Sequence, residues 1–509
     1  MRRGLLVLYL VLAACGDPAS TDAGAEADAG ADTDAGTDTD AGADTDAGTD
    51  ADAGTDTDAS TDPDAATDAG PPPIDPARTI GVVAHTDGVA PGYTLFAPMG
   101  ATTTYLVDLD GRLVHSWESA YRPAASVYLL DDGSLLHTGA LGRVENPTFQ
   151  AGGAGGVVER LDWSGDVAWS YRYADDDHSA HHDVERLPDG NVLIVAWERF
   201  TATEAAALGW DPARLGPAGL WLDHVIEVRP VGADGGEIVW AWHLADHLVQ
   251  PRDPSLGSYG DPAARPGRVD VDLAGGMAPD WSHVNAIDYD ADRDEILLSV
   301  HGLHEIWVID HATTTAEAAG PAGDLLYRWG NPANLGAAGD QQLFGQHDAQ
   351  WIGAGLPGAG HVLVFDNGVR RPGGNRSTVD ELRFPVTADG YGDPREASAD
   401  ARVWSYDPGA EDPMYAKNIS GAQRLTNGNT LVCDGPIGTF REVTTDGVVV
   451  WRYVSPVVGT TLLAWDDPPP ADTMGRSNAV FRATRVPPDH PGLAGRDLTP
   501  GETIERGPP

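Results

Sequence analysis

The amino-acid sequence predicts an all-β protein, a six-bladed β-propeller with four-stranded blades that is preceded by a disordered acidic linker. Three observations carry this prediction. The 509 residues include 62 glycines, 38 prolines and 15 tryptophans, a mixture typical of many tight turns and many large packing side chains. One pattern of short apolar strands and Asp-Gly-type turns recurs along most of the chain. Residues 16–75 lack the apolar side chains that a folded core needs.

Residues 1–15 have the parts of an export signal: a charged start, a short apolar run and small residues at the cleavage site. The apolar run is too short for a resident membrane-spanning helix. Because it ends in Leu-Ala-Ala-Cys, the segment resembles a bacterial lipoprotein signal, in which the cysteine, here Cys15, is lipidated. An ordinary secretory signal with a chance cysteine is the alternative. Lipidation would anchor the protein in the cell envelope, in the outer membrane on its periplasmic or surface face.

Residues 16–75 form a tract of Asp, Ala, Gly and Thr that holds 18 acidic residues and no basic one. It cannot bury a core, and repulsion between like charges keeps it extended. We expect a tether that holds residues 76–509, the predicted propeller, away from a membrane. Subtracting these acids from the net charge of −46 leaves the folded part acidic as well. This balance argues against a nucleic-acid partner, which needs clustered Lys and Arg, and favours an exported enzyme for small molecules.

Six units follow at intervals of roughly 40 to 80 residues, each with apolar strands, Asp-Gly-type turns and a Trp in its last strand. Four-stranded sheets of this size are typical of propeller blades, whose radial closure protects the sheet edges. A late strand, residues 480–486, can complete the thin first unit and close the ring. We expect the tryptophans of the last strands to pack between sheets: Trp117, Trp169, Trp240, Trp329, Trp404 and Trp451.

Histidines recur where the innermost strands of successive blades begin. When the units are aligned on their turns, blade 3 has His182, blade 5 has His347 and blade 6 has Ser420 at this position. His283 of blade 4 falls at the same level or within one residue of it. Equivalent positions of a propeller lie on one ring around the central channel. We therefore predict that three imidazoles converge at one mouth of the channel and form a site.

Several segments resemble the bacterial arylsulfate sulfotransferases, which transfer sulfuryl groups between phenols without an adenosine phosphosulfate donor. The segments, spread over residues 92–498, are 181–191, 280–285 (Asp-Trp-Ser-His-Val-Asn), 345–350 (Gly-Gln-His-Asp-Ala-Gln), 364–368 (Val-Phe-Asp-Asn-Gly) and 481–497. The family fold is a six-bladed propeller, in agreement with the unit count. The resemblance implies aryl sulfates and phenols as partners, no cofactor, and a ping-pong reaction through a sulfohistidine.

The resemblance also implies roles for individual residues. The family nucleophile is the histidine of the Gln-His-Asp segment, which is His347 here. A neutral imidazole suits this role because it attacks a sulfate ester without bringing negative charge. His182 and His283 match family histidines that clamp sulfuryl oxygens or protonate the departing phenolate. Asn285 matches a family position that can donate its amide.

One position departs from the family pattern. The family follows its His-Val-Asn strand with a Ser-Arg pair whose guanidinium grips the sulfate, whereas this chain has His301 at the arginine position. An imidazole is shorter than a guanidinium and supplies charge only when it is protonated. Three consequences are possible when the family arginine is absent: the site accepts a different ester, its activity is reduced, or another arginine, such as Arg328 or Arg371, reaches into the site.

Two aromatic residues near the predicted mouth, Trp281 and Tyr415, are candidates for stacking on an aromatic substrate, with packing as the alternative. Two functions of other classes also remain open. The channel histidines are adequate ligands for a divalent transition metal, which would give a metal-dependent enzyme. A non-catalytic surface propeller would instead bind a ligand or a protein through its long insertions, at residues 199–224, 245–280 and 367–401. The sequence gives no expectation for the oligomeric state.

Overall fold

The computed structural model describes residues 74–508 except 276–278, 389, 397–398 and 471–476. The predicted signal with Cys15, and all but the last two residues of the predicted tether, lie outside this part of the chain. No helix of the described ranges is long and apolar enough to span a membrane.

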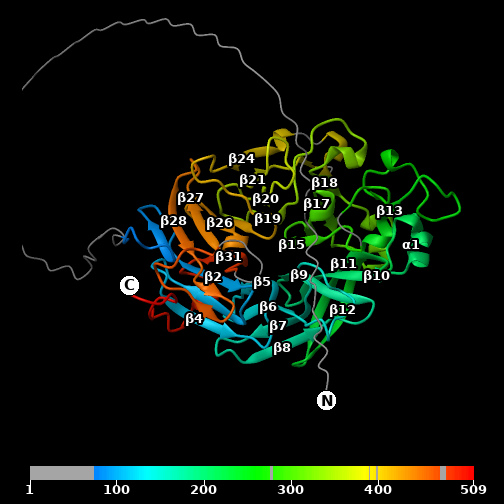
Figure 1. The fold of residues 1–509 in the computed structure, drawn as a ribbon. Helices are drawn as coiled ribbons and strands as arrows, with labels where there is room; N and C mark the ends of the chain where they lie inside the picture. The colour runs from blue at the N-terminus through cyan, green and yellow to red at the C-terminus, as the bar shows by residue number, and fades with distance from the viewer. Residues whose placement is uncertain (1–73, 276–278, 389, 397–398, 471–476, 509) are drawn as a thin grey trace, which may run out of the picture. The chain divides into compact units, whose positions relative to one another are not determined.

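Six antiparallel sheets surround a central channel (Figure 1), which confirms the predicted six-bladed propeller. Strands are given from the channel outward. Blade 1 contains β31 (Val480–Val486), β2 (Tyr93–Pro98), β3 (Thr103–Val107) and β4 (Leu113–Glu118). Blade 2 contains β5 (Pro123–Leu129), β6 (Leu135–Ala140), β7 (Gly156–Leu161) and β8 (Val167–Arg172). Blade 3 contains β9 (His178–Arg186), β10 (Val192–Phe200), β11 (Leu220–Val231) and β12 (Gly235–His243).

The other three blades follow the same plan. Blade 4 contains β15 (Val284–Asp290), β16 (Glu295–Val300), β17 (Glu305–Asp310) and β18 (Tyr327–Trp329). Blade 5 contains β19 (His347–Trp351), β20 (Val362–Asp366), β21 (Thr378–Leu382) and β24 (Arg402–Tyr406). Blade 6 contains β25 (Gly421–Arg424), β26 (Thr430–Asp434), β27 (Thr439–Val443) and β28 (Val449–Val454).

The ring is closed by both ends of the folded chain. β31 pairs with β2, as predicted, so the last strand completes the first blade. β1 (Gly81–His85) pairs with β28 and gives blade 6 a fifth, outermost strand, which the sequence pattern did not predict. The innermost strands contact one another in the order β31, β5, β9, β15, β19, β25 and again β31. The channel is therefore enclosed on all sides by inner strands.

The recurrent tryptophans lie on the fourth strand of each blade, counted from the channel, and pack against the next blade. The indole of Trp117 donates to the Asp162 carbonyl of blade 2 at 3.1 Å, and that of Trp169 donates to Gly235 of blade 3 at 2.8 Å. Trp451 donates to Leu109 of blade 1 at 2.9 Å. Packing between sheets is thus confirmed for these residues, with an added hydrogen bond across each of these blade boundaries.

Short helices and two-stranded pairs lie between the strands of the blades. Helix α1 (Ala202–Leu208) begins at Thr201, whose side chain accepts from the backbone of Glu204 in a capping box, and ends at Gly209 in the left-handed conformation. Helix α2 (Thr315–Ala318) has a capping box of the same kind. Two-stranded pairs complete the fold: β13 (Leu248–Val249) with β14 (Val269–Asp270), β22 (Val386–Thr387) with β23 (Gly390–Tyr391), and β29 (Val457–Val458) with β30 (Thr461–Leu462).

Candidate active site

Four histidines lie together at one end of the channel: His182, His283, His301 and His347. Their ring centroids form a chain, with 4.7 Å from His182 to His283, 5.1 Å from His283 to His301 and 5.2 Å from His301 to His347. His283 lies just before the inner strand β15, His347 opens β19, and His182 lies within β9. These inner strands run in the same direction around the channel, so the three side chains lie toward one mouth. His301 opens a 3₁₀ turn between β16 and β17. The structure thus brings together the four histidines selected from the sequence.

Residues in the left-handed conformation, which is uncommon for side chains other than glycine, lie within β9, just before β15 and at the second residue of β19. His182 has φ 49° and His283 has φ 50°, so these two side chains occupy equivalent backbone positions. In blade 5 the left-handed residue is Asp348, with φ 55°. The turns keep the alignment made from the sequence, because Leu187 and Ile352 donate equivalent backbone hydrogen bonds across their turns. His182 and His347 each lie five residues before these positions.

A strained turn of blade 6 contacts His347. Ile419 and Ser420 have φ values of 50° and 87°, and a β-branched residue such as Ile419 adopts this conformation only under strain. The turn is held because Ser420 donates its N–H to the Phe481 carbonyl at 3.1 Å and accepts from Gly435 N–H at 2.9 Å. It directs the Ile419 N–H at Nε2 of His347, at 3.1 Å.

The hydrogen bonds of His347 define which ring nitrogen carries the proton. Asn367 donates its amide N–H groups to the carbonyls of Ala416 and Ile419, so its Oδ1 must accept from Nδ1 of His347, at 2.7 Å. Nε2 is then the unprotonated nitrogen, and its electron pair accepts the hydrogen bond from the Ile419 N–H. Burial lowers the pKa of His347 to about 3, although the hydrogen bond to Asn367 acts in the opposite direction. His347 is therefore a neutral imidazole at physiological pH.

His283 has the opposite electrostatic character. Its Nδ1 lies 2.5 Å from Oδ2 of Asp280, whose other oxygen accepts from the indole N–H of Trp197 at 3.0 Å. Burial alone would lower the pKa of His283, but the Asp280 carboxylate outweighs burial and raises it. Within one cluster, a histidine that favours the protonated form thus lies beside neutral ones.

His182 and His301 are neutral. Burial lowers the pKa of each well below its ordinary value, and the nearby His283 adds to this effect. His301, at the family's arginine position, therefore offers a hydrogen-bond donor but no charge. His182 lies with its Nδ1 2.8 Å from Nδ1 of His181.

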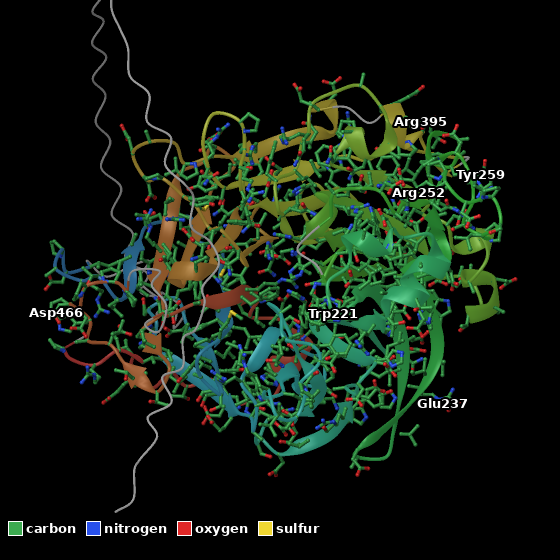
Figure 2. All side chains as sticks on the ribbon, turned by 45° about the vertical axis from the view of Figure 1, so that its right-hand side comes forward. Trp221, Glu237, Arg252, Tyr259, Arg395 and Asp466 are labelled. Carbon is green, nitrogen blue, oxygen red and sulfur yellow. The ribbon has the colours of Figure 1, made fainter. Side chains whose placement is uncertain are left out.

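The support behind His182 comes from blade 3 and its insertion. The ring of His181 stacks on Trp197 at 3.9 Å, and its Nε2 lies 2.9 Å from Asp223. Trp197 packs in turn against Phe149 and Trp221, and Trp221, which is labelled in Figure 2, is buried. This aromatic support fixes the position of the His181–His182 pair.

Gly153 leaves the space that the His182 ring occupies. A Cβ at this glycine, whose φ is +74°, would lie 2.2 Å from Cε1 and Nε2 of His182. We expect Gly153→Ala to cost about 1–3 kcal/mol of unfolding free energy and to lower kcat/KM about tenfold or more, because the ring must move. The neighbouring Gly152 has nothing within 4 Å, so Gly152→Ala is the matched control. Urea unfolding and steady-state kinetics of both variants measure the difference; equal effects would contradict this role of Gly153.

An arginine that the sequence analysis did not select lies beneath the cluster. Arg482 of β31 contacts Oδ2 of Asp183 and Oδ1 of Asp348, each at 2.8 Å, and donates to the Tyr128 hydroxyl at 2.6 Å. Its charge contributes to the lowered pKa of His347. The two arginines considered from the sequence are engaged elsewhere, since Arg328 pairs with Glu305 and Arg371 pairs with Asp366. The only sequence signal for Arg482 was the Phe-Arg-Ala segment of the family resemblance.

Replacing Arg482 by methionine is expected to destabilise the fold by about 3–5 kcal/mol, because Asp183 and Asp348 are buried and would keep unpaired charges. Arg395, which pairs with Asp393 on the surface (Figure 2), is the control; Arg395→Met should change stability by less than about 0.5 kcal/mol. Chemical denaturation of both variants checks this expectation. A loss no larger for Arg482→Met than for Arg395→Met would show that the channel does not depend on this ion pair.

The three residues selected for substrate contacts have different surroundings. Asn285 is fully buried, donates to the Gln346 carbonyl at 2.9 Å, and has an Oδ1 without a hydrogen-bond partner. Trp281 is 5% exposed and packs edge-on against Trp210 within a hydrophobic cluster, so the structure does not bring it to the histidines. Tyr415 remains 42% exposed, next to Ala416, whose carbonyl binds Asn367.

Comparisons with known proteins give distant structural likenesses. A crystal structure of a protein of unknown function from Bacteroides caccae is 12% identical, covers 77% of this chain and 98% of its own, and has a TM-score of 0.39. Virginiamycin B lyase from Staphylococcus aureus is 9% identical, with coverage of 74% and 88% and a TM-score of 0.32. These likenesses are too distant to carry an argument about this chain. No curated protein matches its sequence.

The family comparison is specific. The family model described as Arylsulfotransferase (ASST) matches residues 91–455, which is well over half of the chain. The matched range contains all four channel histidines and Asn367, Asp280 and Asn285. It begins just before β2 and ends just after β28, so it includes every strand of the propeller except β1 and β31. The chain therefore belongs to the arylsulfotransferase family.

Proposed function

We propose that this protein is an aryl sulfotransferase that needs no adenosine phosphosulfate and moves a sulfuryl group from an aryl sulfate ester to a phenolic acceptor, through a sulfohistidine at His347. Family membership supports aryl sulfotransferase activity in general. The observation that carries the proposed mechanism is the pairing of a neutral His347 with His283, whose pKa is raised, in one buried cluster. A nucleophile and a proton donor with separated pKa values are what a transfer between two phenols requires.

In the first half-reaction, the Nε2 electron pair of His347 attacks the sulfur of the donor ester. The bond from sulfur to the aryl oxygen breaks, and the departing phenolate takes the proton of His283. The ring of His347 gains positive charge, which the carbonyl of Asn367 stabilises through Nδ1–H. In the second half-reaction, neutral His283 takes the proton of the acceptor phenol, whose oxygen attacks the sulfur as the sulfur–nitrogen bond breaks.

The sulfuryl oxygens need hydrogen-bond donors throughout. The neutral rings of His182 and His301 each offer an N–H group. The Ile419 N–H donates to Nε2 of His347 at 3.1 Å, and we propose that it turns to a sulfuryl oxygen when this nitrogen attacks. Asn285 is the fourth candidate donor. Such fixed donors stabilise charge in a water-poor site without reorganisation. We propose that they replace the arginine that the family places at the position of His301.

We also propose that the enzyme acts in the cell envelope, anchored by lipid on Cys15 and held off the membrane by the acidic tether. The sequence pattern of residues 1–75 supports this proposal. Small aryl sulfates and phenols then reach the channel mouth from the surrounding solution.

The test is the mass of the protein after brief mixing with 4-nitrophenyl sulfate at neutral pH. We expect a gain of about 80 Da, the mass of a sulfuryl group, on the peptide that contains His347, and its loss when phenol is added. Absence of both the adduct and nitrophenol release would overturn the proposal for aryl sulfate donors. An adduct on a different histidine would keep the transfer reaction but reject His347 as the nucleophile.

A further inference from the structure

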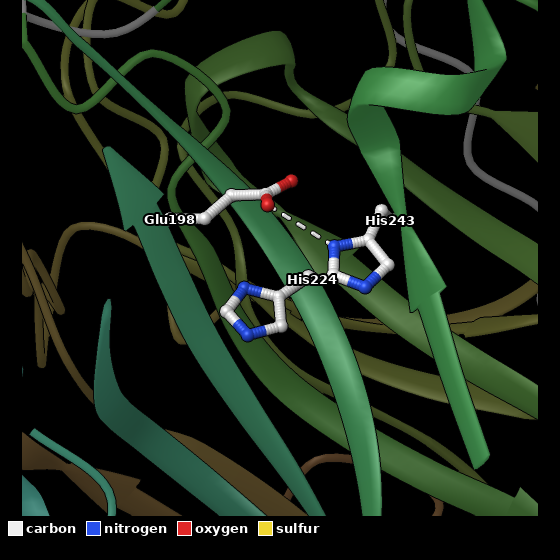
Figure 3. Close-up of side chains that lie close together, drawn as sticks. All are labelled: Glu198, His224 and His243. Atoms are coloured by element: carbon white, nitrogen blue, oxygen red, sulfur yellow. Dashed lines mark hydrogen bonds and ion pairs between the residues drawn. The ribbon is translucent and has the colours of Figure 1, made fainter. Parts of the chain in front are cut away.

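A second cluster of potential ligands lies in blade 3, among residues that the proposed reaction does not use. Glu198 of β10, His224 of β11 and His243 of β12 offer one ligand atom each, and these atoms all lie within 4.8 Å of one another (Figure 3). Within the described part of the chain, this is the one group of three His, Cys, Asp or Glu side chains that meets this condition. The four channel histidines do not form such a group.

The strand register explains why the three side chains meet. His224 is paired directly with Ala196 on one side and with His243 on the other, and Glu198 follows Ala196 by two residues. Side chains two residues apart in a strand, and side chains of directly paired residues, point to the same face of a sheet. The cluster is therefore built on three rigid neighbouring strands, and not on a loop.

Two side-chain atoms of the cluster lack hydrogen-bond partners. Oε1 of Glu198 and Nδ1 of His224 are buried and make no hydrogen bond of normal geometry, and His224 is fully buried. Figure 3 shows a ring nitrogen of His224 turned toward the Glu198 carboxylate, which is also 3.1 Å from Nδ1 of His243. Buried polar atoms without partners are uncommon and call for an explanation. A cation between these side chains would supply the missing partner of Nδ1 of His224.

The outer surroundings of His224 fit a metal ligand. Its Nε2 lies 3.0 Å from the hydroxyl of Tyr173, which can accept the ring proton and leave the Nδ1 electron pair free.

We propose that Glu198, His224 and His243 form a binding site for one divalent transition-metal ion of the zinc type. Two imidazole nitrogens and one carboxylate suit zinc and its neighbours, whereas calcium and magnesium prefer sites made of oxygen ligands. Three protein ligands leave a further position open. The side chain of His243 is 34% exposed and that of Glu198 is 13% exposed, so this position faces solvent.

The site is linked to the channel through the strand β11. The residue before His224 is Asp223, which points to the other face, accepts from the Ser282 hydroxyl and from the Val284 N–H at 3.1 Å, and lies 2.9 Å from His181. A metal ion that fixes His224 therefore also fixes the strand that holds the segment around His283. We infer that the ion stabilises blade 3 and is not a participant in sulfuryl transfer.

The experiment uses the purified full chain, stripped with a chelator and then titrated with Co²⁺ and with Zn²⁺. We expect one ion per chain, measured by elemental analysis, and visible Co²⁺ absorption bands that Zn²⁺ abolishes by competition. Glu198→Gln and His243→Gln should weaken binding at least tenfold. Glu237→Gln, on the exposed start of β12 where Glu237 pairs with Arg229, is the matched control and should bind as the unchanged protein does.

Two further measurements keep the proposal open to refutation. His301→Gln should retain the ion, because the His301 side chain lies in the channel and not in the proposed site. If His301→Gln lost the ion while Glu198→Gln and His243→Gln still bound it, the metal would lie in the channel and the proposal would be overturned. Thermal unfolding of each variant in chelator should match that of the unchanged protein, which separates lost ligands from lost folding. Failure of the correctly folded, unchanged protein to bind either ion would also overturn the proposal.

Discussion

Replacing His347 by alanine is expected to lower kcat/KM for 4-nitrophenyl sulfate by about 10⁴-fold or more and to abolish the sulfuryl adduct. The reason is that the substitution removes the only atom proposed to form a bond to sulfur, Nε2, so both half-reactions lose their covalent path. Nitrophenol release and intact mass measure the two effects. Because His347 is buried and hydrogen-bonded at both nitrogens, each preparation must first be shown to unfold cooperatively.

His361 provides the matched control for this substitution. It lies in the same blade, at the opposite end of the β19–β20 hairpin, and pairs with Glu381 at 2.6 Å. His361→Ala should retain the adduct and nearly all of the activity. If His347→Ala kept its activity while remaining folded, sulfuryl transfer would have to proceed through another residue or directly between the two phenols.

Replacing Asp280 by asparagine is expected to have the second largest effect, a loss of about 10²–10³-fold in kcat/KM for phenyl sulfate. Asp280 raises the pKa of His283 against the effect of burial, so without this carboxylate the ring loses its proton at a lower pH. The acid form of His283 is the active one, and activity falls as the pH rises through its pKa. In Asp280→Asn this fall should therefore occur at lower pH than in the unchanged protein.

The choice of leaving group separates this role from a structural one. A nitrophenolate is a weak base that departs with little protonation, so the loss in Asp280→Asn should be much smaller for 4-nitrophenyl sulfate than for phenyl sulfate. Asp294→Asn is the control, since Asp294 forms a similar pair with His311, at 2.7 Å, at the far end of β15. Equal losses with both esters, or an unchanged pH profile, would reject His283 as the proton donor.

The repeat pattern was enough to predict the propeller and part of its site. Asp-Gly-type turns and a Trp in each last strand are local signals, and each unit carries its own copy. Because equivalent positions in a ring of blades face one channel, the pattern also predicted that His182, His283 and His347 meet. The pairing of β1 with β28 had no such signal. It joins segments almost 370 residues apart in the chain, and nothing in residues 81–85 repeats elsewhere.

The chemical character of the site depended on contacts between blades. From the sequence alone the four histidines cannot be told apart in their protonation. In the structure, burial makes His347 neutral, whereas the Asp280 carboxylate raises the pKa of His283. Likewise, Asn367, at the end of β20, defines the tautomer of His347. Trp281, which the sequence suggested as a substrate contact, packs against Trp210 in a hydrophobic cluster.

The sequence by itself determined the architecture and the identity of three of the four channel histidines, because both follow from a repeated local pattern placed on a closed ring. Only the tertiary structure decided which histidine can act as nucleophile and which as acid. It also decided that Arg482 supports the channel and that Glu198, His224 and His243 meet on one face of blade 3. The physical reason is that pKa values, tautomers and ligand geometry depend on burial and on partners from distant segments, and neither is encoded in the spacing of residues along the chain.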